Sequence, residues 1–131
     1  KSKWLMGFSV GSAYSFAVMI RDVADQKLFK GQLAISGAAI SPLVSGRDLM
    51  HPTVEAARSN ASAVQGIKSW MYCGEKDLDH SWSMCTEMPN GESFVNTHGG
   101  AATLYKDPNG THNSLPSNAS GRNLMFDFMA Q

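Results

Sequence analysis

Short apolar runs alternate along the chain with stretches in which apolar residues recur every three or four positions. Residues 4–8 form a mostly apolar run without alternation, which is typical of a strand buried on both faces. Three similar runs predict further strands, over residues 31–35, 69–73 and 101–105. The strand signals are thus spread evenly through the sequence.

Helical spacing fills the intervals between these runs. Apolar residues from Ala13 to Ala24 fall on one helical face, and a final helix is predicted from about Asn118. Weaker patterns predict helices over 52–64 and 81–88, the second ended by Pro89-Asn90-Gly91. Strands that alternate with helices imply crossover connections. The pattern therefore predicts an α/β fold, a mainly parallel sheet with helices on both faces.

Composition narrows the class of protein. The 131 residues suit one domain, and 11 Lys and Arg balance 11 Asp and Glu. The zero net charge and the lack of a basic run argue against a nucleic-acid partner, and no apolar stretch is long enough for a membrane span. Because the sequence begins at Lys1 rather than at a methionine, it neither shows nor excludes a signal peptide upstream. Between the possible locations, a secreted or periplasmic one is slightly favoured over the cytoplasm.

Two cysteines, Cys73 and Cys85, lie twelve positions apart. Without a C-x-x-C motif, zinc-ribbon and thioredoxin-like functions are excluded. Cys73 stands in an apolar run, and we expect it to be a buried free thiol, with a disulfide to Cys85 as the alternative.

The main chemical signal is Gly7-Phe8-Ser9-Val10-Gly11, a G-x-S-x-G motif between a predicted strand and a predicted helix. In this motif the serine sits on a sharp, strained turn that lifts its hydroxyl clear of the sheet, while the flanking glycines let neighbouring chain pass close by. The following amide, on Val10, points at a developing oxyanion. Ser9 is therefore the candidate nucleophile, and Phe8 a candidate for substrate binding. The alternative is an ordinary glycine-rich turn.

A serine nucleophile needs a histidine base, and ligands in parallel sheets bind at the carboxyl ends of the strands. His112 follows the fourth predicted strand, where the base should be. His98 precedes that strand, on the wrong side of the sheet, and His51 comes before any candidate acid. His80 follows the third strand but occupies the place of the acid. His112 is therefore the candidate base, with a solvated loop histidine as the alternative.

The acid should leave the carboxyl end of the third strand, where Asp77 and Asp79 stand, with Glu75 as a third candidate. Asp107 is only five residues before the candidate base and would have to fold back on its own loop. We rank Asp77 first and Asp79 second. Together with His80 these two aspartates could bind a metal instead, but no further His or Cys stands at ligand spacing.

With these motifs the chain resembles the α/β-hydrolase superfamily over nearly its whole length. Residues 7–11 match the nucleophile elbow, and residues 30–38 resemble the strand and small-residue loop that follow the elbow helix. Residues 74–77 match the G-x-x-D that carries the acid, and residues 110–112 match the glycine-rich turn before the catalytic histidine. From the elbow through Ser41 the sequence resembles the polyhydroxybutyrate-depolymerase and feruloyl-esterase group.

The resemblance also implies that something precedes this chain. Such enzymes carry several strands before the elbow, and the loop that supplies the second oxyanion-hole amide belongs to that part. Residues 1–131 are thus expected to form a single domain that is the C-terminal part of a larger α/β-hydrolase domain, with the missing N-terminal half as partner. The four strands should be neighbours, with the nucleophile strand at the edge. Ser12 departs from the family, in which many members have glycine there.

The predicted function is hydrolysis of a small-molecule carboxylic ester, with Ser9, His112 and Asp77 as the triad and the Val10 amide as half of the oxyanion hole. This chemistry needs no cofactor. The loop 41–48 is a further candidate for the substrate pocket. A peptidase or amidase on the same fold is one alternative, because a triad does not choose between ester and amide. A non-catalytic binding domain or a truncated remnant is the other.

Overall fold

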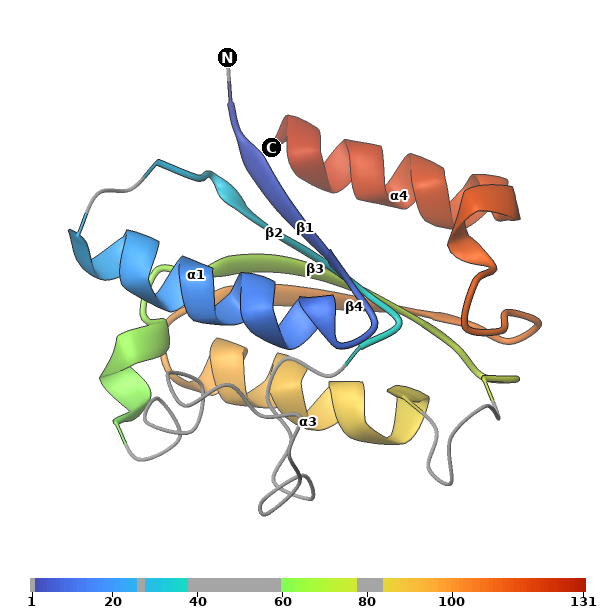
Figure 1. The fold of residues 1–131 in the computed structure, drawn as a ribbon, viewed down its shortest axis with the longest axis horizontal. Helices are drawn as coiled ribbons and strands as arrows, with labels where there is room; N and C mark the ends of the chain where they lie inside the picture. Colours follow the sequence, from blue (N-terminus) through green and yellow to red (C-terminus); the bar gives the residue numbers. More distant parts are fainter. Residues whose placement is uncertain (1, 26–27, 38–59, 78–83) are drawn as a thin grey trace.

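The structure is a computed structural model that describes residues 2–25, 28–37, 60–77 and 84–131. In these ranges one parallel sheet forms, with the strand order β1-β2-β3-β4 (Figure 1). The strands are β1 (Trp4–Phe8), β2 (Gly31–Ile35), β3 (Lys68–Gly74) and β4 (Ala101–Asp107). All four apolar runs are therefore strands, and consecutive strands are neighbours, as predicted.

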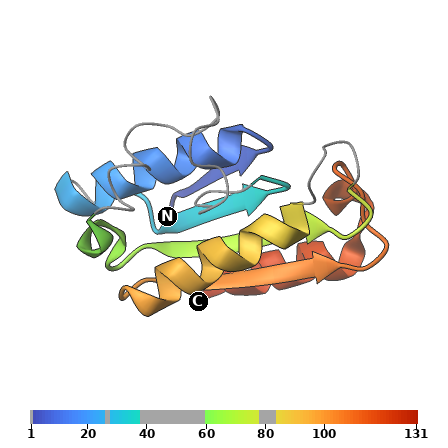
Figure 2. The ribbon, with the colours of Figure 1, turned by 90° about the horizontal axis from the view of Figure 1, so that it is seen from below.

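Helices cover both faces of the sheet. Helices α1 (Gly11–Asp25) and α3 (Met84–Thr97) lie on one face, and α4 (Ala119–Ala130) lies on the other (Figures 1 and 2). Two short 3₁₀ helices, η2 (Ala61–Val64) and η3 (Leu115–Ser117), precede β3 and α4. This arrangement confirms the predicted fold class, an α/β half-sheet with parallel strands and helices on both faces.

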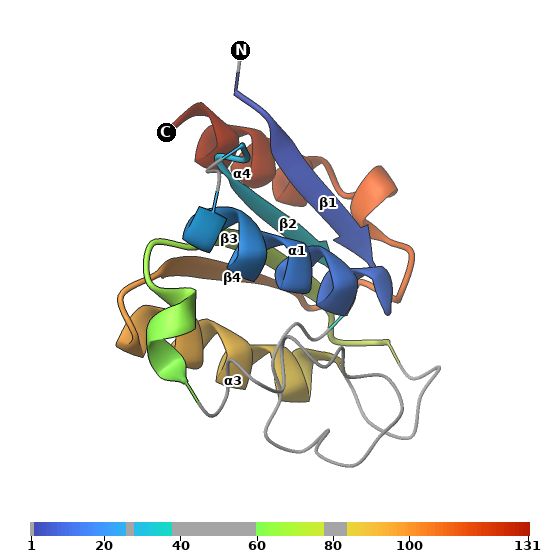
Figure 3. The ribbon, with the colours of Figure 1, turned by 60° about the vertical axis from the view of Figure 1, so that its left-hand side comes forward.

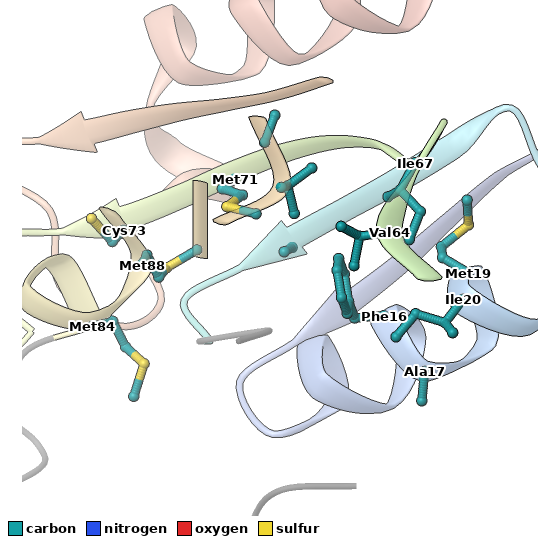
Figure 4. Close-up of a cluster of buried hydrophobic side chains, with 13 residues drawn as sticks. Phe16, Ala17, Met19, Ile20, Val64, Ile67, Met71, Cys73, Met84 and Met88 are labelled. Atoms are coloured by element: carbon teal, nitrogen blue, oxygen red, sulfur yellow. The ribbon is translucent and has the colours of Figure 1, made fainter. Parts of the chain in front are cut away.

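β3 contributes side chains to two separate hydrophobic cores, because successive side chains of a strand point to opposite sides of the sheet. Met71 and Cys73 pack with Phe16, Met19 and other residues between the sheet and the helices α1 and α3 (Figure 4). On the opposite face, a second cluster packs against α4: Leu33, Ile35, Trp70, Tyr72, Leu115 and Met125. Both faces of the sheet are thus covered by helices, and the two central strands, β2 and β3, are buried almost throughout, as their apolar runs predict. The outer strands β1 and β4 are partly exposed.

Helix α3 contradicts the prediction that Pro89-Asn90-Gly91 ends a helix. It runs from Met84 to Thr97 with Pro89 inside it. The proline removes one backbone donor. Burial of Met88, Gly91 and Val95 continues beyond it, and this apolar face outweighs the lost hydrogen bond. Of the weaker predicted helix 52–64, only residues 60–64 are described, and 61–64 of these form η2.

The prediction of a free thiol at Cys73 is wrong, because Cys73 and Cys85 form a disulfide. Cys73 is the last residue but one of β3 and lies on the face covered by α3, and Cys85 stands in the first turn of that helix. Their Cα atoms lie 5.3 Å apart, within the usual range for a disulfide. The bridge thus links the end of β3 to the start of α3, across the stretch of sequence that contains Asp77.

Strand β1 lies at the end of the sheet, and beyond it Figure 3 draws no further described strand. Two of its apolar side chains are exposed: Met6 by 58% and Phe8 by 46%. With Ile35 and α4 residues such as Met125 they line a largely apolar groove of about 290 Å³. No helix among the described residues is long and apolar enough to cross a membrane.

Candidate active site

The candidate residues gather where the four strands end. Because the strands are parallel, their carboxyl ends meet at one edge of the sheet, as the arrowheads in Figure 2 show. Ser9 directly follows β1, Ser36 follows β2, Asp77 lies three residues after β3, and His112 lies five residues after β4. This is the edge at which parallel α/β sheets bind their ligands.

Ser9 occupies a strained turn between β1 and α1. Its φ is +52°, in the left-handed region that non-glycine residues rarely adopt. The Ser9 N–H donates to the Ile35 carbonyl at 2.8 Å, and the Ser9 carbonyl accepts from the Ser12 N–H at 2.9 Å. The turn is therefore fixed on both sides, by the neighbouring strand and by the first turn of the helix. Strain of this kind concentrates at functional sites.

The two glycines of the G-x-S-x-G motif play different parts. A Cβ at Gly7 would lie 2.3 Å from the carbonyl oxygen of Gly11, so only glycine lets the strand and the helix approach this closely. A Cβ at Gly11 would meet no described atom within 4 Å. The close passage of the chain that the motif predicts is therefore seen at Gly7, while none of the described residues crowds Gly11.

Ser12, the departure from the family pattern, is fully buried and ties the strand ends together. Its hydroxyl lies 3.0 Å from the carbonyl of Gly7 and 3.3 Å from that of Ile35. The N–H of Val10, beside Ser9 in the turn, donates to no backbone carbonyl of the described residues.

Asp77 and His112 are in direct contact. The Nδ1 atom of His112 lies 2.7 Å from Oδ2 of Asp77, and the two side chains are only 12% and 1% exposed. The ring of Phe8, adjacent to Ser9, meets the imidazole edge-on with the ring centroids 5.0 Å apart. The structure therefore brings the candidate acid, the candidate base and the nucleophile strand together. Asp79 lies outside the described residues, as do His51 and His80.

The loops that carry the acid and the base are joined by backbone hydrogen bonds. The N–H of Glu75 donates to the Asp107 carbonyl at 2.9 Å, and the N–H of Lys76 donates to the Gly110 carbonyl at 2.8 Å. A Cβ at Gly74 would lie 2.4 Å from that Gly110 oxygen, so the glycine permits the close approach. The contact between Asp77 and His112 therefore rests on a rigid pair of loops.

Asp107, ranked below the other candidate acids, holds the base loop from within. Its Oδ2 accepts from the Tyr72 hydroxyl at 2.8 Å and from Asn118 Nδ2 at 2.5 Å. Burial alone would raise the pKa of this carboxyl, but these two hydrogen bonds and those from the Asn109 and Gly110 amides outweigh it and lower the pKa. Burial and the Asp107 carboxylate raise the pKa of Tyr72, so its hydroxyl stays protonated and donates.

Because folding lowers the pKa of Asp107, the free energy of unfolding should fall as the pH becomes acidic. A carboxyl whose pKa is depressed by folding stabilises the protein above its unfolded pKa of about 3.9, and the stabilisation is lost as the pH falls through the lower folded value. We expect Asp107→Asn to lower the free energy of unfolding at pH 7 and to flatten its loss on acidification. Urea unfolding of both proteins between pH 7 and pH 3 measures this. Parallel pH curves for the two proteins would contradict it.

Other candidates are placed as follows. The Nδ1 atom of His98 lies 2.7 Å from the Phe94 carbonyl, and His98 precedes β4, on the side of the sheet away from Ser9, as predicted. The loop 41–48 lies outside the described residues. Among the residues that the structure describes, no cluster of three or more His, Cys, Asp or Glu could hold a metal. Sequence reasoning missed Tyr72 and Ser36, two buried residues whose role depends on contacts across the sheet.

No protein-family model and no curated protein matches this sequence. Among solved structures, the orthorhombic crystal form of Pyrococcus horikoshii acylaminoacyl peptidase is similar, with a TM-score of 0.63 and 12% identity over 98% of this chain. The uncomplexed form of that peptidase gives a TM-score of 0.61 and 14% identity over 97%. In both cases the match covers 23% of the peptidase chain, so this chain spans about a quarter of its length.

These similarities show the fold: the chain has the architecture of part of an α/β-hydrolase domain. The more specific resemblance to the polyhydroxybutyrate-depolymerase and feruloyl-esterase group finds no support in these neighbours.

Proposed function

We propose that this chain carries the acyl-transfer residues of a serine hydrolase that cleaves carboxylic esters. The observation that carries the proposal is the 2.7 Å contact between Asp77 and His112 at the edge of the sheet where Ser9 stands on its strained turn. The nucleophile, the acid and the base follow three different strands, β1, β3 and β4. This order along the chain, serine then acid then histidine, is typical of α/β-hydrolases.

In the proposed mechanism the Nδ1–H of His112 donates to Asp77, which leaves Nε2 as the base. Nε2 takes the proton of the Ser9 hydroxyl as its oxygen attacks the ester carbonyl, and returns the proton to the leaving alcohol. A water molecule then hydrolyses the acyl-enzyme by the same proton path. Because Asp77 is 1% exposed, its charge is little screened by solvent and stabilises the imidazolium strongly.

The tetrahedral intermediate places a negative charge on the former carbonyl oxygen. In the proposal the Val10 amide supplies one hydrogen bond to it, from a turn that is fixed before substrate arrives. A second donor would come from chain that precedes β1. No cofactor takes part in any of these steps.

The substrate is proposed to be a small or aromatic ester, with Phe8 beside the reacting carbonyl. Phe8 is 46% exposed and packs against the imidazole, so an apolar group of the substrate could rest on it. A peptidase or amidase is the second candidate, and the observation that favours it is the fold similarity to acylaminoacyl peptidases. A non-catalytic domain is the third.

Paired substrates separate these candidates. The full-length protein would be assayed with a p-nitrophenyl ester and a p-nitroanilide that share one acyl group. For an esterase, kcat/KM for the ester divided by kcat/KM for the anilide should exceed the ratio of the rates at which the two compounds hydrolyse without enzyme. Preferential cleavage of the anilide would favour the peptidase, and no turnover of a panel of either kind would favour the non-catalytic domain.

We also propose that a preceding part of the same domain covers the outer edge of β1. Met6 is exposed on this strand beside the apolar groove against α4, and the sheet ends at this strand within the described residues. An exposed strand with unpaired backbone groups tends to pair with another segment of polypeptide chain. The neighbouring peptidases, which are about four times as long, would accommodate such a part.

Residues 1–131 expressed alone are therefore expected to self-associate or stay partly unfolded, and to hydrolyse p-nitrophenyl esters barely above background. Loss of one oxyanion donor alone typically costs about 100- to 1,000-fold in turnover. Light scattering and an esterase assay on the isolated fragment measure both effects. A monodisperse monomer with efficient turnover that depends on Ser9 would show that these residues are a complete hydrolase.

A further inference from the structure

Ser36 directly follows β2 and lies between the nucleophile turn and the base. It is fully buried, and its φ is +49°, so it shares with Ser9 the left-handed conformation that disfavours side chains. Its N–H donates to the Tyr72 carbonyl at 2.8 Å, and its hydroxyl donates to the backbone carbonyl of His112 at 2.7 Å. The side chain that directly follows β2 thus binds the main chain of the candidate base.

The same segment also touches the nucleophile turn. A Cβ at Gly37 would lie 1.9 Å from the carbonyl oxygen of Ser9, so the backbone there lies directly against the turn. On the other side of Ser36, the Ile35 carbonyl accepts from the Ser9 N–H at 2.8 Å. Residues 35–37 therefore contact Ser9 through both flanking residues and His112 through the hydroxyl between them.

We propose that Ser36 is a positioning residue, whose hydroxyl sets the separation of His112 from Ser9. The proposal rests on the proposed serine-hydrolase function. Asp77 fixes the orientation of the imidazole through Nδ1, and the hydrogen bonds from Glu75 and Lys76 join the base loop to the acid loop. The bond from Ser36 adds a tie between the main chain of His112 and the segment that contacts Ser9. Glycine would suit the backbone conformation better, so the hydroxyl is the feature that the serine adds.

The size of the effect follows from geometry. A misplacement of about 1 Å between reacting groups costs on the order of 100-fold in rate. We expect Ser36→Ala in the full-length protein to lower kcat by about 10- to 100-fold with KM little changed. Labelling of Ser9 by a fluorophosphonate should slow in parallel. Because the contact between Asp77 and His112 is kept, the pH midpoint of kcat/KM should not move.

A matched control separates positioning from loss of a buried hydrogen bond. Ser69 on β3 is equally buried, and its hydroxyl donates to Gln32 Oε1 at 3.1 Å. It stands near the start of its strand, away from the carboxyl edge. Ser69→Ala should lower the melting temperature as much as Ser36→Ala does, but it should leave kcat unchanged.

Ser36→Gly is the second variant, because glycine adopts the positive φ without strain and keeps the fold. It should retain or raise the melting temperature while losing kcat as Ser36→Ala does, a divergence that a merely structural role would not produce. Wild-type kcat in a folded Ser36→Gly protein, or equal losses of kcat in Ser36→Ala and Ser69→Ala, would overturn the proposal. If turnover survives in Ser9→Ala, the serine-hydrolase function itself is wrong; if only Ser9→Ala loses it, the role of Ser36 alone is wrong.

Discussion

Ser9→Ala is expected to reduce ester turnover of the full-length protein by about four to six orders of magnitude. Without the hydroxyl no acyl-enzyme can form, and only substrate binding and the oxyanion donors still act on the reaction. The fold should survive, because the described contacts of Ser9 are made by its backbone: its N–H to Ile35 and its carbonyl to Ser12. Alanine and serine are strained to a similar degree at a positive φ, so the substitution should leave the conformation of the turn unchanged.

The control is Ser15→Ala in α1. Ser15 is buried, and its hydroxyl donates to the Ser12 carbonyl at 3.0 Å and accepts from Gln32 Nε2 at 2.6 Å, so this variant loses buried hydrogen bonds without touching the turn. Stopped-flow or steady-state kinetics with a p-nitrophenyl ester compare the activity of the two variants, and circular dichroism checks that both are folded. Undiminished turnover in a folded Ser9→Ala protein would rule out the mechanism.

Asp77→Asn is expected to lower kcat by about 10⁴-fold. Asparagine is the same size as aspartate, but its amide cannot stabilise the imidazolium and favours the tautomer in which Nδ1 accepts rather than donates. The burial of Asp77, at 1% exposure, means that no nearby solvent replaces the lost charge. Substrate binding should change little, so the loss should appear in kcat rather than in KM.

Asp79→Asn is the matched control for this variant, since the two aspartates stand two residues apart and the sequence alone does not exclude either. We expect it to cost far less activity than Asp77→Asn. Steady-state kinetics of both proteins with one ester decide the assignment. Equal losses, or a larger loss in Asp79→Asn, would mean that Asp77 is not the acid.

Much of this arrangement could be predicted from local sequence. The four strands are marked by short apolar runs, which are buried almost throughout in the central strands β2 and β3, and their regular alternation with helices predicts a parallel order. The parallel order places every strand end at one edge. Asp77 and His112 could therefore be chosen by their position after β3 and β4, without any knowledge of their contact.

The features that sequence reasoning missed depend on contacts between distant segments. Ser36 binds a carbonyl 76 positions away, and Tyr72 binds Asp107 across 35 positions. Neither partner could be chosen by spacing. The disulfide of Cys73 follows from the packing of α3 on the sheet. The same packing keeps α3 helical through Pro89, against the local signal of proline, asparagine and glycine.

The central claim is that Ser9 is a nucleophile activated by His112. Covalent labelling of the full-length protein with a fluorophosphonate, followed by peptide mass spectrometry, tests it most directly. One adduct is expected, on the peptide that contains Ser9, and its rate of formation should collapse in His112→Ala. An adduct confined to another serine, or labelling of Ser9 at the same rate in His112→Ala, would contradict it.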